Sequence, residues 1–180
     1  MDRKLYVISG PSGIGAGDII ADIFEQRSDV SAVIPVTARK LKAGERDGVG
    51  FFFFDLDGWN TLKEAGDLLE STEFAGNDYG TSRRLVQEKL SEGRHVILSL
   101  EIGRAAQVKQ NMPEAVCIYM EPSANVLKER YRAVSRNSLE LSVRLETAEK
   151  QRALSGFCDY RICSDDREAA LSALNDILNA

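Results

Sequence analysis

The stretch LYVISGPSGIGAGD, residues 5–18, decides the fold class of this chain. Residues 5–9 form an apolar run typical of a buried strand, and the apolar residues that follow Asp18 favour a helix. A strand, a glycine-rich turn and a helix in this order are the setting of a phosphate-binding loop, whose backbone N–H groups converge on an anion. The stretch therefore predicts an α/β fold of the P-loop type, although such a turn can also serve tight packing alone.

The same loop lacks its usual positive charge. A working loop of the form G-x-x-x-x-G-K-[ST] adds a lysine for the outer phosphates and a hydroxyl for Mg²⁺. Here Ala16 stands at the lysine position, and Asp18 places a carboxylate in the first helical turn. Because that carboxylate complements the positive helix end, it competes with a bound phosphate. The candidate phosphate-loop residues are Gly10, Ser12, Gly13, Gly15, Ala16, Gly17 and Asp18.

Length and composition indicate one ordinary globular domain. The chain has 180 residues, 43% of them hydrophobic, and a net charge of −5. This charge argues against a broad nucleic-acid surface. No apolar run approaches the length of a membrane span, and the N-terminus leaves no room for a signal peptide. The three cysteines lack metal-ligand spacing, so we expect reduced, buried thiols, a cytoplasmic protein and no metal site made by the chain.

Hydrophobic patterning predicts how the domain is organised. Apolar runs predict strands at 5–9, 95–100, 115–121 and, more weakly, 160–163. Helical patterns occur at 17–27, 82–92, 102–111, 124–133, 139–155 and 166–179. This alternation favours a parallel sheet with helices on both faces. The lone histidine, His95, precedes a strand and is expected to be structural.

Two segments interrupt the alternation. Residues 34–81 are rich in glycine, aromatic and charged residues, and we interpret them as an inserted subdomain. Residues 124–155 are a charged helical pair, which beside a phosphate loop is a candidate lid. A solvated helix face is the alternative for those charges. The core would then comprise residues 1–33, 82–123 and 156–180.

Several motifs together resemble the guanylate kinase family, and the resemblance covers nearly the whole chain. They are VISGPSGIG at 7–15, TARKLKAGE at 37–45, DGV at 47–49, EFAGNDYGT at 73–81, QV at 107–108 and SDD at 164–166. In that family ATP phosphorylates GMP to GDP, with Mg²⁺ accompanying the ATP. The resemblance implies a P-loop core, a GMP-binding subdomain at 34–81 and a mobile lid at 124–155.

For the phosphate of GMP, the resemblance implies a clamp that is fairly well kept. Arg39 and Lys42 match the clamping cations, and Glu45 matches the acidic residue of that segment. Lys42 stands where the family usually has arginine, so the bidentate fork is lost. Phe51 aligns with a tyrosine that donates to the phosphate, whereas Tyr79 matches the other phosphate-binding tyrosine.

For the guanine base, the resemblance implies that Glu70 and Thr81 are the readers. Glu101 aligns with an aspartate that also reads guanine, and Pro35 replaces a serine at the start of the Arg39 segment. The alternative for Glu70 and Thr81 is a surface carboxylate and a helix N-cap.

The ATP side departs further from the family. Ser99 replaces the first acidic residue of a strand-end pair, and Ser164 replaces an adenine-side asparagine. In the lid, Arg132 and Arg144 match catalytic arginines, whereas a third arginine position falls on Val134. ATP binding is therefore doubtful, and Mg²⁺ with ATP is expected as cofactor only if the chain is active.

The sequence thus favours a protein that binds GMP or a related purine nucleotide, with kinase activity weak or lost. A second interpretation is an active kinase with a relocated cation, supplied by Lys4, Arg136 or Arg104, the last standing where the family has a small residue. A third is a non-catalytic module that binds a protein partner. A related sugar-phosphate kinase fits the GMP-side motifs less well.

Overall fold

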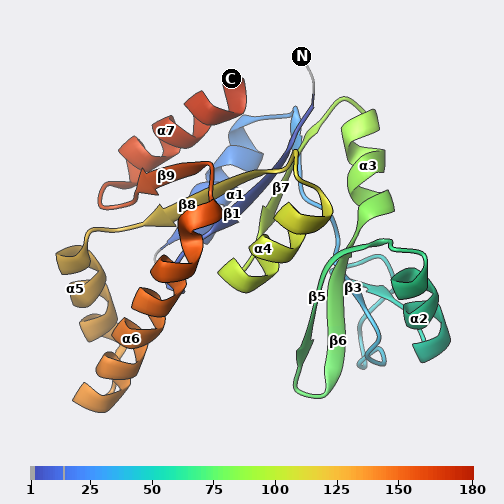
Figure 1. Cartoon of the computed structure of the whole chain (residues 1–180), viewed down its shortest axis with the longest axis horizontal. Helices are drawn as coiled ribbons and strands as arrows, with labels where there is room; N and C mark the ends of the chain where they lie inside the picture. The colour runs from blue at the N-terminus through green and yellow to red at the C-terminus, as the bar shows by residue number, and fades with distance from the viewer. Residues whose placement is uncertain (1–2, 14) are drawn as a thin grey trace.

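A five-stranded, fully parallel sheet forms the centre of the molecule (Figure 1). The structure, a computed structural model, describes residues 3–13 and 15–180. The strands lie in the order β2-β7-β1-β8-β9, which confirms the predicted α/β class. Their bounds are β1 Leu5–Ser9, β2 Val30–Ser31, β7 His95–Ser99, β8 Val116–Glu121 and β9 Tyr160–Cys163.

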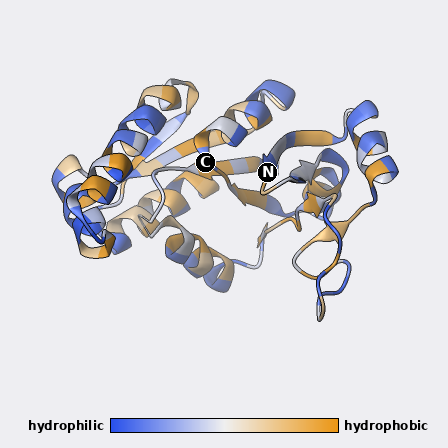
Figure 2. Ribbon diagram, turned by 90° about the horizontal axis from the view of Figure 1, so that it is seen from below, coloured by the Kyte–Doolittle hydropathy of each residue, from blue (hydrophilic) through white to orange (hydrophobic). Residues whose placement is uncertain are grey.

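Alternation along β1 explains why both faces of the sheet are covered. Leu5 and Val7 belong to one buried cluster, and Tyr6 and Ile8 belong to the other. Helices α1 (Ala16–Gln26) and α7 (Arg167–Asn179) pack on the Tyr6 side, and α3 (Arg83–Ser91) and α4 (Ile102–Asn111) pack on the Leu5 side. Figure 2 shows the apolar strands between helices of mixed polarity. This packing fixes the carboxyl ends of the strands, where open α/β sheets bind ligands.

The predicted insertion contains a second, four-stranded sheet in the order β4-β3-β6-β5. Its elements are β3 Val36–Thr37, β4 Phe52–Phe53, α2 Leu56–Glu64, β5 Leu68–Phe74 and β6 Asn77–Ser82. Gly80 lets β6 approach β5 closely, since a Cβ there would lie 2.7 Å from the Glu70 carbonyl oxygen. Helix α2 is not among the predicted helices, although Asp55 caps it by accepting from the Gly58 N–H at 2.8 Å.

The charged segment 124–155 forms the predicted helical pair, α5 (Ala124–Val134) and α6 (Ser138–Leu154). Figure 1 shows the pair on the opposite side of the central sheet from the four-stranded sheet. Leu141 and Leu145 of α6 pack against the main core cluster. The short helix Ser155–Phe157 then leads to β9. None of the described helices is long and apolar enough to cross a bilayer.

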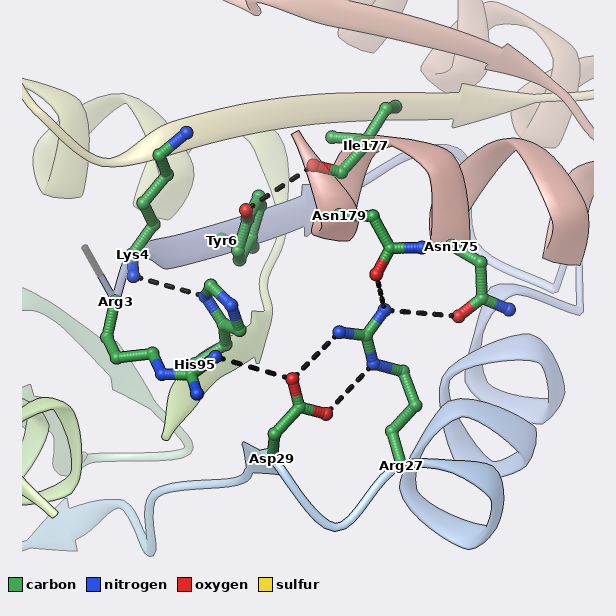
Figure 3. Close-up of polar contacts among 9 residues, drawn as sticks. All are labelled: Arg3, Lys4, Tyr6, Arg27, Asp29, His95, Asn175, Ile177 and Asn179. Carbon is green, nitrogen blue, oxygen red and sulfur yellow. Dashed lines mark hydrogen bonds and ion pairs between the residues drawn. The ribbon is translucent and has the colours of Figure 1, made fainter. Parts of the chain in front are cut away.

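The amino ends of the central strands are joined by polar contacts (Figure 3). His95 is buried there, where its Nδ1 accepts from the backbone N–H of Lys4 at 3.2 Å and its ring packs edge-on against Tyr6. This position suits the expected structural role. The expectation of buried cysteines holds for Cys117 only, because Cys158 is half-buried and Cys163, at the end of the edge strand β9, is exposed.

Candidate functional site

The glycine-rich loop joins β1 to α1 at the carboxyl end of the central sheet. Gly13 and Gly15 have φ angles of +75° and +84°, a left-handed backbone that other residues rarely adopt. The Gly15 carbonyl accepts from the N–H groups of Asp18 and Ile19 at 3.1 and 3.3 Å, which starts the helix. Backbone geometry therefore fits the predicted phosphate cradle.

A cavity of about 370 Å³ lies against this loop. Ser99, the last residue of β7, forms a second wall with Leu100 and Glu101, which follow the strand, and Gln151 of α6 contributes to the lining. Among the described residues that line the cavity there is no lysine or arginine, and Glu101 carries the charge. The hydroxyl of Ser9, at the end of β1, is buried without a hydrogen-bond partner in the described part of the chain. The loop residues at this wall are Gly10, Ser12, Gly13, Gly15, Ala16 and Gly17.

Asp18 lies on the other flank of the loop, in a cavity of about 260 Å³. This cavity also contains Arg130 and Arg167, which the sequence reasoning did not select. Arg130 donates to the Ser164 carbonyl at 2.8 Å, and Arg167 pairs with Asp22 at 2.6 Å. Arg167 directly follows the SDD segment at 164–166, and this position in the sequence could have marked it as a candidate site residue. These two arginines therefore line the same cavity as Asp18, whereas Ala16 lines the loop cavity, whose described lining contains no arginine.

A larger cavity of about 720 Å³ lies between the central sheet and the four-stranded sheet. Its volume is within the range of small-molecule sites. Tyr79, Thr81 and Arg104 line it, together with Phe51 and several apolar side chains. Ser99, Leu100 and Glu101 line both this cavity and the loop cavity. A ligand in one cavity would thus face a ligand in the other across this segment.

Arg39 and Glu45, two residues of the predicted phosphate clamp, pair with each other beside Phe51, which lines the larger cavity. Arg39 donates to both carboxylate oxygens of Glu45, at 2.6 and 2.7 Å. Hydrogen bonding from Arg39 lowers the pKa of Glu45 to about 2, with a smaller contribution from the Lys42 N–H. The Lys42 side chain itself is exposed.

Two aromatic rings pack against the guanidinium of Arg39. The rings of Phe51 and Phe53 lie 5.1 and 5.0 Å from its central carbon, within the range of cation–π attraction. Tyr79 packs edge-on against Phe51 with centroids 5.7 Å apart. Phe51 therefore has a positioning contact even though it offers no hydroxyl to a phosphate.

Glu70 is not at the surface of the larger cavity, because Arg104 and Thr81 cover it. Its side chain is 0% exposed, whereas that of Arg104 is 24% exposed. Arg104 donates through Nε to Oε2 at 2.5 Å and through Nη2 to Oε1 at 2.8 Å, and the Thr81 hydroxyl donates to Oε1 at 2.6 Å. Direct contact between Glu70 and a base stays a prediction; the group that the structure presents to the cavity is Arg104.

Helix α4 fixes Arg104 in this position. Gln107 and Asn111 lie on the same face of the helix and bond to the backbone of β5. Gln107 accepts from the backbone N–H of Ser71 and donates to its carbonyl, and Asn111 donates to the Leu69 carbonyl. Glu101, at the N-cap of α4, is exposed and lies at the junction of the two cavities. No local sequence pattern indicates the Arg104–Glu70 pair, because its members are 34 residues apart.

The arginines of the predicted lid are paired within the helical hairpin. Arg132 bonds to Glu129 at 2.7 Å, and Arg144 and Arg136 share Glu140 at 2.9 and 3.4 Å. Among the described linings of the three cavities, Arg132, Arg136 and Arg144 do not occur. Their catalytic role stays a prediction that requires the lid to move.

The three relocated-cation candidates do not lie at the loop. Lys4 precedes β1 (Figure 3). The loop follows the other end of this five-residue strand, about 16 Å away at roughly 3.3 Å per residue. Arg104 forms an ion pair with Glu70. Arg136, the third candidate, has a side chain that is 90% exposed and paired with Glu140. The structure therefore brings none of these three side chains to the glycine-rich loop.

Comparisons with known proteins agree with this architecture. The family model "Guanylate kinase" matches residues 2–180. A guanylate kinase of Synechococcus sp. (strain JA-3-3Ab) is 36% identical over 97% of this chain and 82% of its own length. That of Enterococcus faecalis is 34% identical over 97% of this chain and 87% of its own length.

Solved structures give the same fold. The guanylate kinase of Anaplasma phagocytophilum superposes with a TM-score of 0.66 at 23% identity, over 98% of this chain and 85% of that one. A shikimate kinase of Bacteroides thetaiotaomicron gives 0.54 at 10% identity, over 98% and 99% of the two chains. Because the family model spans nearly the whole sequence and several relatives exceed 30% identity, this chain belongs to the guanylate kinase family.

Proposed function

We propose that this protein binds GMP or a closely related purine nucleoside monophosphate, and that its transfer of phosphate from ATP is weak or lost. The observation that carries the proposal is the loop cavity, whose described lining contains no lysine or arginine. Phosphoryl transfer depends on positioning and on stabilising charge, so this absence bears directly on activity.

The monophosphate side retains groups suited to binding. Arg39 is held by Glu45 and two aromatic rings, and Tyr79 reaches the larger cavity. A guanidinium already fixed in place loses little freedom when it binds an anion. The monophosphate would occupy the larger cavity, with its phosphate toward Arg39 and Tyr79 and its base toward Arg104 and Thr81.

The ATP side does not fit the Mg²⁺–ATP complex that the family uses. Gly17 offers no hydroxyl after the lysine position, and Ser99 stands where the family has a carboxylate. Among the described residues that line the loop cavity, Glu101 is the single carboxylate, whereas Mg²⁺ in such sites is usually held by one or two carboxylates together with the phosphates. We therefore assign no step to Mg²⁺ in this chain.

Calorimetric titration with GMP and with ATP plus Mg²⁺ tests the proposal. We expect GMP to bind and ATP to give no saturable heat. Arg39→Ala should weaken GMP binding about tenfold or more, because charge-assisted bonds to the phosphate are lost. Arg46→Ala is the matched control, since Arg46 is exposed nearby. Tight ATP binding without GMP binding would contradict the proposal.

An active kinase remains the second candidate, favoured by Arg130 and Arg167 on the flank of the loop. It predicts ATP binding and substantial turnover. A protein-interaction module is favoured only by the changed phosphate-site residues Pro35 and Phe51. It predicts that neither nucleotide binds.

A further inference from the structure

We propose that Arg104 makes the base site a reader of 6-oxopurines in general, which recognises ring O6 and N7 and ignores the 2-amino group of guanine. The inference rests on the proposed purine monophosphate site and specifies which bases that site accepts. It differs from the resemblance, which implies that a carboxylate at Glu70 reads the donor edge of guanine.

The carboxylate of Glu70 has little left to offer a base. A carboxylate has about four acceptor positions, and three are occupied here by two N–H groups of Arg104 and the Thr81 hydroxyl. The fourth, on Oε2, is out of reach because the Glu70 side chain is 0% exposed. The guanine 2-amino group and ring N–H therefore find no acceptor at this carboxylate.

Arg104 presents the opposite chemistry to the cavity. Its Nε and Nη2 face Glu70, and within the described part of the chain no hydrogen bond is made by its Nη1. A guanidinium that donates to O6 and N7 is the commonest specific contact to the guanine edge. Hypoxanthine offers the same two acceptors. Adenine replaces O6 with an amino donor, which faces the N–H groups of Arg104 unfavourably.

The position of Arg104 is fixed before any ligand arrives. Helix α4 is tied to β5 by Gln107 and Asn111, and Glu70 orients the guanidinium from behind. Glu70 is thus a positioning residue, which aims Arg104 and balances its charge. A fixed donor fork discriminates between bases because the wrong base leaves its N–H groups unpaired.

Titration of the intact protein with GMP, IMP and AMP tests this inference. We expect GMP and IMP to bind within about threefold of each other, and AMP to bind at least about tenfold more weakly. In Arg104→Ala, the carboxylate of Glu70 opens to the cavity, so GMP should exceed IMP by about tenfold or more. Arg94→Ala, an exposed charge-matched control, should leave both ratios unchanged.

The outcomes separate the two proposals. If none of the three nucleotides binds, the proposed function fails and this inference fails with it. If GMP binds at least tenfold more tightly than IMP to the unaltered protein, the proposed function stands and this inference is overturned, since Glu101 or a displaced Glu70 must then read the 2-amino group. The comparison on the unaltered protein needs no variant, so it decides the question even if Arg104→Ala fails to fold.

Discussion

Replacing Arg104 with alanine should destabilise the protein strongly, because it leaves a buried charge without its partner. The Glu70 side chain is 0% exposed, and in the variant only the Thr81 hydroxyl would still donate to it. Removing one member of a buried ion pair costs about 3–5 kcal/mol. We expect about 3 kcal/mol, at the low end, because the 24% exposure of Arg104 lets water reach the vacated space.

A second substitution separates the effect of charge from the loss of packing. Glu70→Gln preserves the shape of the side chain and removes its charge, so Arg104→Ala/Glu70→Gln should be more stable than Arg104→Ala alone by at least about 1 kcal/mol. Urea unfolding at pH 8 measures both values. For a chain of this length, 3 kcal/mol corresponds to about 6–12 °C in melting temperature. The reasoning is refuted if Arg104→Ala lies within about 0.5 kcal/mol of the unaltered protein, or if Glu70→Gln destabilises it further.

Three other predictions follow from the geometry. Arg27 bonds to Asp29 (Figure 3) and holds the pKa of this carboxyl at about 2, below its usual 3.8. Ionised Asp29 therefore stabilises the fold above pH 4, and this contribution is lost as the pH falls toward 2. In Asp29→Asn, the dependence of stability on pH should be weaker between pH 4 and pH 2. Gly15→Ala should cost about 1–2 kcal/mol in urea unfolding because of its left-handed backbone, whereas Gly17→Ala, inside α1 with open space around it, should stabilise by up to about 1 kcal/mol. Ala16→Lys alone should leave turnover more than tenfold below the roughly 1–100 per second of kinases, because the other departures from the family pattern remain; recovery to that range in a coupled assay would contradict this expectation.

Much of the fold could be predicted because its signals are local. Apolar runs marked the four long strands of the central sheet, and 3.6-residue periodicity marked the six helices around it to within about two residues. Helix α2 was missed because the four phenylalanines at 51–54 favour a strand reading up to its N-cap, Asp55. Only Phe52–Phe53 forms a strand there, and Phe51 and Phe53 instead support Arg39.

Candidate site residues could be selected from the sequence only where they belong to contiguous motifs. Arg39 and Glu45 lie six residues apart, and their pairing follows from the local turn. The pairing of Arg104 with Glu70 depends on how α4 packs on β5, a tertiary contact with no local signal. The same holds for Arg130, which reaches the loop flank only after α5 has packed against the SDD segment.

The central claim is that a phosphate loop whose cavity has no lysine or arginine in its described lining cannot support efficient transfer to GMP. Steady-state formation of GDP from GMP, ATP and Mg²⁺ by the unaltered protein tests it most directly. Loss of one stabilising group costs roughly 10²–10³ in rate, so we expect turnover below about 1 per second. Turnover of about 1–100 per second, as in ordinary kinases, would contradict the claim and would assign the missing charge to another residue.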